Sequence, residues 1–178
     1  MTTTWTPIAK GLHWLMAALL LGLLALGLYM TDLPLSPEKL LLYSWHKWLG
    51  VSAFLLLWCR LLWRLTHRAP AAPEGVSAGM VRLATLGHLA LYALMLLIPL
   101  SGWLMSSAKG VPTVWFGLWP IPDLLPRDRA LGDALQLVHR ALNYLLMATI
   151  AGHVAAALWH HTVRKDDTLR RMLPARQS

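Results

Sequence analysis

The sequence predicts an all-α integral-membrane protein, a four-helix bundle with both termini in the cytoplasm. The composition is 57% apolar and only 13% charged, whereas an ordinary soluble domain holds about 25% charged residues. In addition, the chain contains long apolar stretches that each approach the roughly twenty residues required to cross a bilayer core. The length of 178 residues suits a single membrane domain covering residues 1–178.

Polar, proline or basic residues bound each apolar stretch. The first ends at Asp32 and is expected to be retained as a helix, since it lacks an Ala-x-Ala cleavage site. The second ends in an arginine series that begins at Arg60. Pro99 lies inside the third, where it should kink the helix or free a carbonyl. A Pro/Ala/Gly connector and a long loop rich in Pro and Trp separate the later stretches, at 69–79 and 106–134. The expected spans are about residues 12–30, 43–65, 81–105 and 135–161.

The basic residues indicate the orientation of the bundle. A net charge of +8 could suggest a nucleic-acid partner, but the charges lie between apolar runs, so we expect no nucleic acid and apply the positive-inside rule instead. One side holds ten: Lys10, Arg60, Arg64, Arg68, Arg82, Arg164, Lys165, Arg170, Arg171 and Arg176. The other holds six: Lys39, Lys47, Lys109, Arg127, Arg129 and Arg140. The excess predicts cytoplasmic termini.

Histidines occur inside the apolar stretches, where a polar ring needs a partner. His139 and His153 are fourteen residues apart in the last stretch, which corresponds to about 21 Å and about 1400° along a helix. The two rings therefore share one face. The predicted topology places His46 at the depth of His139, near the outer surface, and His13 at the depth of His153, in the inner half.

Two histidine pairs at two depths suit haem. A haem iron takes axial ligands from opposite sides, which facing helices can supply, whereas zinc prefers three or four ligands that commonly include Cys, Asp or Glu. No carboxylate lies inside any expected span, and the lone Cys59 excludes a Cys-x-x-Cys-His tether. The pattern predicts two non-covalent haem b groups, with His88 as an alternative inner ligand. Small residues near the histidines would let a flat macrocycle approach: Gly11, Gly50 and Gly152.

Several motifs carry a resemblance to a known family: "GLHWLMA", "WHKWLG", "RLLWRL", "LGHLALYALMLLIPLSG", "VHRALNYLL", "AGHVAAALWHH" and "KDDTLRRMLP". With these motifs the sequence resembles, over nearly its whole length, the bacterial cytochrome b561 family. Its members are small four-helix di-haem cytochromes related to the cytochrome b subunits of nickel hydrogenase and formate dehydrogenase. The resemblance implies that His13 and His153 hold the iron of the inner haem, and that His46 and His139 hold that of the outer haem.

The resemblance also implies a location and a function. It places the chain in the bacterial inner membrane as a multi-pass protein that exchanges electrons with a quinone pool, and some members resemble superoxide oxidases. We therefore expect an oxidoreductase that moves electrons between a small donor, such as superoxide, and ubiquinone. The alternative is a membrane-anchor subunit that passes electrons to or from a dehydrogenase or hydrogenase. A haem-free protein with structural histidines is the third interpretation.

Further candidate contacts lie near the span ends, and none of them is assigned as catalytic. The hydrogen-bonding candidates for a quinone are His88, Ser101 and His160. Outer-side cations could attract an anion, or bind haem propionates or lipid phosphates instead: Lys47, Lys109 and Arg140. The segment "VPTVWFGLWPIP" is expected either to cover the outer haem or to lie in the membrane interface.

Overall fold

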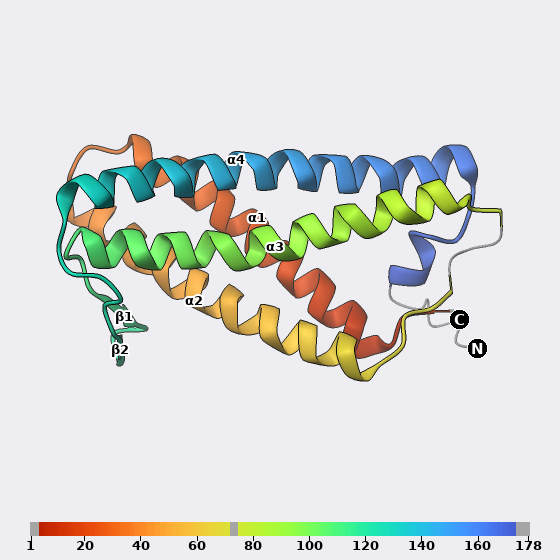
Figure 1. Cartoon of the computed structure of the whole chain (residues 1–178), viewed down its shortest axis with the longest axis horizontal. Coiled ribbons are helices and arrows are strands. Elements are labelled where there is room, and N and C mark those ends of the chain that lie inside the picture. The colour runs from red at the N-terminus through yellow and green to blue at the C-terminus, as the bar shows by residue number, and fades with distance from the viewer. Residues whose placement is uncertain (1–3, 72–74, 174–178) are drawn as a thin grey trace.

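A computed structural model describes residues 4–71 and 75–173 and shows a bundle of long helices (Figure 1). Each of the four helices is long and apolar enough to cross a membrane, which confirms the predicted all-α four-helix bundle. The helices are α1 Pro7–Asp32, α2 Pro37–Thr66, α3 Ala78–Ala108 and α4 Arg129–Trp159. The shorter elements are β1 Thr113–Trp115 and β2 Trp119–Ile121 before α4, and a π-helical turn, His160–Arg164, and a 3₁₀ turn, Arg170–Met172, after it.

The helices begin several residues before the apolar stretches, because a capping side chain precedes each one. In every case a side-chain oxygen accepts a hydrogen bond from the backbone N–H three residues further on, which satisfies a group that the helix leaves free. The four capping residues are Thr6, Ser36, Ser77 and Asp128. The apolar runs mark only the part of each helix that lies in lipid, so helix ends and span ends differ.

The four helices pack as two antiparallel pairs. α1 packs along α2 and α3 packs along α4, while α2 touches α3 less and α1 hardly approaches α4 at the level of the backbone. The termini and the connector between α2 and α3 lie at one end of the bundle, here the terminal end; the α1–α2 connection and the strands lie at the other, here the β-hairpin end (Figure 1). The two pairs therefore face each other across a space that side chains of all four helices line.

The apolar surface is arranged for lipid and not for water. A buried cluster joins three helices at mid-depth through Met16, Leu57 and Met95, but many large apolar side chains point outward, such as Leu21 and Tyr144. A soluble bundle would lose stability by exposing such side chains, whereas a bilayer solvates them. The helix exteriors therefore match the membrane environment that the composition predicts.

The loop expected at 106–134 is shorter than predicted and contains a β-hairpin. α3 continues to Ala108, and β1 pairs with β2 antiparallel, with Trp115 opposite Trp119. Residues 116–118 form the turn, in which Phe116 and Gly117 have positive φ values of 50° and 71°. A glycine between β-branched and aromatic residues is a hairpin signal, and this pattern in the sequence could have predicted it.

Side chains of α2 hold the hairpin against the bundle. The Trp48 indole N–H donates to the Val114 carbonyl at 2.7 Å, and the Trp115 indole N–H donates to the Trp48 carbonyl at 3.2 Å. The Lys47 ammonium donates to the Val111 carbonyl at 2.9 Å. The hairpin therefore has a fixed position beside the helix that carries His46.

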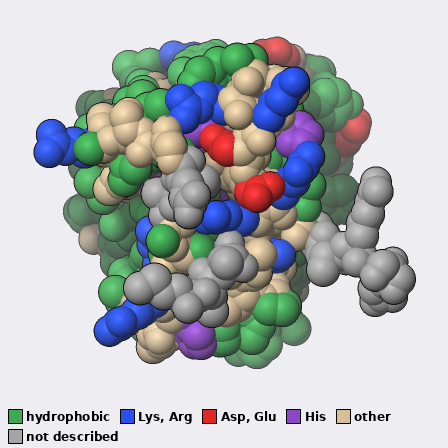
Figure 2. Space-filling view, turned by 90° about the vertical axis from the view of Figure 1, so that its right-hand side faces the viewer, with side chains coloured by type: hydrophobic (Ala, Val, Ile, Leu, Met, Phe, Trp, Pro, Cys, Tyr) green, Lys and Arg blue, Asp and Glu red, His purple; other side chains and the backbone are tan. Residues whose placement is uncertain are grey.

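The chain after α4 folds back across the terminal end. Lys165 adopts a left-handed conformation, φ 55°, which reverses the chain direction. The Lys10 ammonium then donates to the Leu173 carbonyl at 2.8 Å, and the Trp14 indole N–H donates to the Met172 carbonyl at 3.0 Å. Figure 2 shows this end, where Lys and Arg side chains gather beside acidic and histidine side chains.

Candidate functional site

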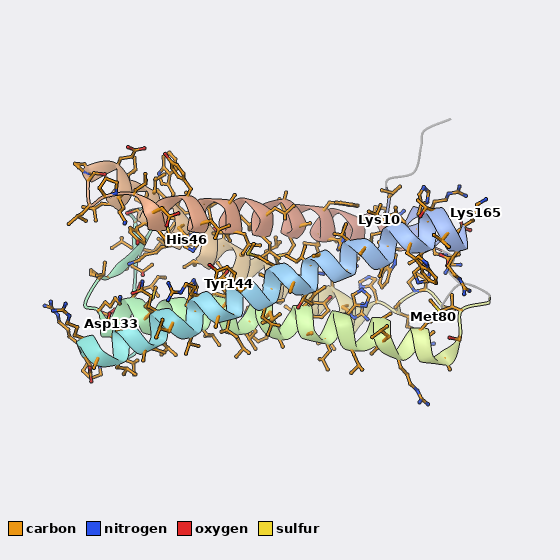
Figure 3. The ribbon with its side chains drawn as sticks, turned by 90° about the horizontal axis from the view of Figure 1, so that it is seen from above. Lys10, His46, Met80, Asp133, Tyr144 and Lys165 are labelled. Carbon is orange, nitrogen blue, oxygen red and sulfur yellow. The ribbon has the colours of Figure 1, made fainter. Side chains whose placement is uncertain are left out.

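The histidines predicted from helix depth lie in two groups between the helix pairs. Towards the β-hairpin end, the rings of His46 and His139 have centroids 6.4 Å apart, and Figure 3 shows His46 in that half of the bundle. Towards the terminal end, the rings of His13 and His153 have centroids 6.2 Å apart. His88 also approaches His153, at 5.4 Å between ring centroids. α4 therefore supplies one ring to each group.

The spacing of both pairs fits a metal held between two rings. A metal–nitrogen bond of about 2 Å on each side, plus the radius of each ring, separates two opposed imidazole centroids by roughly 6 Å. The 6.2 Å and 6.4 Å separations match that value. The ring of His88 lies closer to His153 than a shared metal requires, and the residue is exposed while His13 and His153 are half-buried.

Neighbours on α3 fix the orientation of the His139 ring. Its Nδ1 lies 3.1 Å from the Ile98 carbonyl and 3.0 Å from the Ser101 hydroxyl. Because a carbonyl only accepts, Nδ1 carries the proton, and Nε2 is left with the lone pair that binds a metal. The Ser101 hydroxyl itself donates to Ile98 at 2.7 Å. Ser101 therefore contacts a histidine, which the sequence analysis did not predict.

His46 has a different environment. Its Nδ1 is buried and has no hydrogen-bond partner among the described residues, an arrangement that costs free energy unless the ring gains a ligand. A Cβ added at Gly27 of α1 would lie 3.3 Å from His46 Cε1. A Cβ at Gly102 of α3 would lie 3.2 Å from His139 Cε1. Each ring of this pair thus packs against a glycine on the neighbouring helix.

Sequence reasoning missed Gly27 and Gly102 and selected other glycines. A Cβ at Gly11, Gly50 or Gly152 would meet no heavy atom within 4 Å. Depth places Gly27 and Gly102 in the same half of the bundle as His46 and His139, but only the rotation of each helix about its axis brings them against these rings. Gly27 and Gly102 leave room for the histidine rings. The three glycines chosen from the sequence have open space beside them instead.

An apolar cavity adjoins the pair at the β-hairpin end. His46, His139 and Asn143 are its polar members, and Gly50 forms part of its wall. The remaining lining comes from all four helices: Met16, Leu20, Leu23, Leu24, Ala53, Met95, Ile98, Pro99 and Leu146. A largely apolar cavity with a few converging polar groups is typical of a cofactor site, and a macrocycle held only by axial ligation and packing needs such walls.

The group at the terminal end contains an arginine. The Arg60 guanidinium lies 3.1 Å from His13 Nδ1 through Nη2, and its Nε donates to the Tyr92 hydroxyl at 3.2 Å. The Trp14 ring packs edge-on against His13, with centroids 5.2 Å apart. The sequence analysis used Arg60 to mark the end of a span and counted it among the cations on the cytoplasmic side. The structure places it beside a candidate ligand.

The remaining predicted contacts lie at the two ends of the bundle. Lys109 forms a salt bridge with Asp133 at 3.1 Å and a hydrogen bond with Gln136, whereas Arg140 is exposed one residue after His139. At the terminal end, the His160 ring pairs with Asp166 at 2.5 Å. Lys47 and Arg140 each directly follow a candidate ligand, but the Lys47 ammonium already donates to the Val111 carbonyl.

Asp166 lies beyond the last span and is held as a carboxylate. Burial, the largest influence, raises its pKa, but hydrogen bonds from Thr168 and His160 together outweigh burial and bring the pKa to about 2. The Thr168 backbone N–H donates to Asp166 at 3.0 Å. Asp166 therefore fixes the chain reversal at the end of α4.

Comparisons with known proteins identify the family to which this four-helix chain is similar. The family model of prokaryotic cytochrome b561 matches residues 4–175. The chain is 37% identical to Cytochrome b561 homolog 2 of Escherichia coli over 174 residues, covering 93% of this chain and 89% of that protein. It is 32% identical to the Probable superoxide oxidase CybB of Yersinia pestis over 132 residues, covering 74% of each. It is 28% identical to Cytochrome b561 homolog 1 of Escherichia coli, covering 80% of each.

Proposed function

Because the chain belongs to the prokaryotic cytochrome b561 family, we propose that it is a di-haem cytochrome that transfers electrons across the membrane between a small donor and ubiquinone. Family membership and the four apolar helices make it a multi-pass protein of the bacterial inner membrane that binds b-type haem and transfers electrons. When bound, haem b supplies an iron that changes its charge by one electron at a time.

One observation supports the assignment of two haems above all: two histidine pairs lie at two depths with nearly equal ring separations, 6.2 Å and 6.4 Å. His46 and His139 hold the outer haem, at the β-hairpin end. His13 and His153 hold the inner haem, at the terminal end. The excess of Lys and Arg at the terminal end supports a cytoplasmic location for both termini.

The chain positions the two sites for transfer between opposite faces of the membrane. Fourteen residues of α4 separate His139 from His153, so the sites lie about 21 Å apart along that helix. The apolar walls of the outer site exclude water, and the Ile98 carbonyl keeps Nε2 of His139 free to bind. The protein thereby fixes the position and surroundings of each site.

The donor at the outer side is superoxide. The Yersinia pestis relative is named a probable superoxide oxidase, and the exposed Arg140 beside His139 offers a positive charge that attracts an anion. Two superoxide ions each lose one electron and become oxygen. The two electrons, together with two protons, reduce one ubiquinone to ubiquinol.

The quinone contacts the inner side of the bundle. His88 is exposed on α3 and its ring lies next to that of His153, so it offers a hydrogen-bonding group to a ligand that enters from lipid. His160, held by Asp166, lies at the same end of the bundle and supplies a second group that can bind protons. Both positions suit quinone reduction, which consumes protons.

The decisive experiment is spectroscopy of the protein purified alone in detergent. We expect two haems per chain, reduction of both by superoxide, and reoxidation by a ubiquinone analogue. Reduction only in the presence of a dehydrogenase or hydrogenase would identify an anchor subunit. Absence of haem bands would contradict the proposal altogether.

Histidine variants test the ligand assignment. His139→Ala should lose the outer haem and retain the inner one, because the inner pair does not use that ring. His67→Ala, which alters an exposed histidine after α2, is the control and should retain both haems. His13→Ala and His88→Ala, compared by haem content, decide the inner ligand. The assignment predicts loss of a haem only in His13→Ala.

A further inference from the structure

Arg60 occupies an unusual position for a cation in a membrane protein. It is half-buried on α2, six residues before the helix ends at Thr66, and His13 lies six residues after α1 begins at Pro7. The two side chains therefore meet at the same depth, about 9 Å inside the helix ends. None of the salt bridges between described residues includes Arg60. A guanidinium in apolar surroundings is costly without an anion.

The hydrogen bond between Arg60 and His13 conflicts with metal ligation by His13. Arginine only donates hydrogen bonds, so His13 Nδ1 must accept the bond at 3.1 Å. A neutral ring that accepts at Nδ1 carries its proton on Nε2 and has no lone pair there for a metal. His139 has the opposite arrangement, with Nδ1 donating to a carbonyl. His13 can bind iron through Nε2 only after Arg60 releases Nδ1.

The surroundings show what Arg60 would need after that release. Tyr92 stays in contact with the guanidinium after that release. Its hydroxyl accepts a hydrogen bond from Nε at 3.2 Å, and its ring lies 5.6 Å from the guanidinium carbon. The N–H groups of the guanidinium that do not contact Tyr92 then require another acceptor. A carboxylate is the group that matches the planar fork of a guanidinium.

We propose that Arg60 is a carboxylate clamp for the inner haem: it releases His13 when the haem binds and pairs with a haem propionate. This inference rests on the proposed di-haem function. The propionate supplies the anion that Arg60 lacks among the described residues. The same exchange of partners frees His13 Nε2 to bind iron. Arg60 is a positioning residue that also adjusts the potential of the inner haem.

The charge of Arg60 gives the clamp a measurable signature. A nearby positive charge, and the neutralisation of a propionate, both disfavour the ferric state relative to the ferrous state. Replacing Arg60 by a neutral residue should therefore lower the midpoint potential of the inner haem. We expect about a tenfold change in the one-electron equilibrium constant, which corresponds to about 59 mV.

The test is a redox titration that resolves the two haems in purified holoprotein. Arg60→Gln should lower the inner potential and leave the outer potential unchanged, and Arg60→Lys should give a smaller shift because it retains the charge. Arg64→Gln is the matched control. Arg64 lies one turn further along α2, and its guanidinium carbon is 5.7 Å from the Trp5 ring. This control should leave the outer potential unchanged and shift the inner potential less than Arg60→Gln does, because Arg64 does not contact His13.

An independent readout identifies the anion. With haem labelled by ¹³C at the propionates, the redox-induced infrared difference spectrum should show carboxylate bands that shift in Arg60→Gln and not in Arg64→Gln. Bands that stay fixed in both variants would overturn the clamp.

Other results separate failure of this inference from failure of the proposed function. Two bound haems with unchanged potentials in Arg60→Gln would overturn the clamp and leave the di-haem assignment intact. Loss of the inner haem in Arg60→Gln, with retention in Arg60→Lys, would support the clamp. Loss in both variants would overturn it in favour of a structural role. A wild-type chain without haem would refute the proposed function itself.

Discussion

At the scale of single residues, the two proposed sites differ in how their histidines are held before a cofactor binds. His139 already has its Nδ1 bound to Ile98, so its ring needs no change to act as a ligand. His13 is bound to Arg60 at that same atom and must exchange partners first. The outer site is thus preorganised on the α4 side, while the inner site requires a rearrangement.

Gly27 provides a test of how closely the helices must approach at the outer site. In Gly27→Ala the new Cβ would lie 3.3 Å from His46 Cε1, so the ring must shift by a few tenths of an ångström. Such overpacking costs about 1–3 kcal/mol. We expect weaker retention of the outer haem, measured as haem release on heating.

Gly22→Ala is the control for that measurement, because it lies on the same helix, is exposed and would meet no atom within 4 Å. Both changes gain the same helix propensity. If the two variants release haem at the same temperature, the close packing of Gly27 against His46 has no part in the site.

The histidines could be placed from the sequence because rise per residue and membrane topology fix their depth. The roles of Arg60 and Gly27 could not be predicted from the sequence, because they depend on how α1 and α2 are rotated about their axes. That rotation is set by packing of the buried residues Met16 and Leu57 against α3, and no residue pattern within one helix determines it.

At the scale of elements, the segment after α4 connects the two helix pairs, because it follows α4 and contacts α1. It begins with the π-helical turn His160–Arg164 and reaches back to Lys10 and Trp14 of α1. Trp14 is also the residue whose ring packs against His13. The position of this segment therefore affects the surroundings of the inner pair.

Asp166 controls that segment, and its titration has a defined sign. Its pKa is lowered from 3.8 to about 2, so its contribution to stability is complete above pH 3.8 and is lost as the pH falls towards 2. We therefore expect the amide hydrogen exchange of residues 166–173, once corrected for the intrinsic exchange rate, to be the same at pH 7 and at pH 5.

Asp166→Asn should remove the charge-assisted hydrogen bond, which is worth about 1.5–3 kcal/mol, and should raise exchange of that segment roughly tenfold or more at pH 7. Asp167→Asn is the matched control. The Asp167 side chain is 61% exposed and forms only a 3.6 Å pair with Arg170. Equal exchange in the two variants would show that Asp166 does not hold the segment.

Sequence patterns predicted the long helices but not the short elements between them. The apolar runs and capping residues determine α1 to α4 locally. The β-hairpin has strands of only three residues, and Pro120 in β2 cannot donate to the ladder. Its position depends on Trp48 and Lys47 of α2, which lie far away in the sequence.

At the scale of the whole molecule, each proposed haem would join the two helix pairs. Both histidine pairs take one ring from the α1–α2 pair and one from α4, while α1 hardly touches α4 directly. Cofactor binding is therefore expected to supply much of the cohesion between the two halves of the bundle.

Removing the haem tests how much it stabilises the association of the two helix pairs. A ligand at 1,000 times its dissociation constant stabilises the folded state by about 4 kcal/mol, and 1 kcal/mol shifts the Tm of a chain of this size by about 2–4 °C. Protein produced under haem starvation should therefore unfold at least roughly 10 °C below the holoprotein in the same detergent. An unchanged Tm would show that the helix pairs associate without the cofactor.

The use of α4 in both sites also sets an order of biogenesis. A membrane protein is synthesised from its N-terminus, so His13 and His46 enter the bilayer while the chain that carries their partners is still being translated. In the proposed assignment, neither coordination sphere can close until His139 and His153 have left the ribosome. Haem delivery is therefore a late step of maturation, and until it occurs the cell must tolerate an inserted chain with open ligand positions.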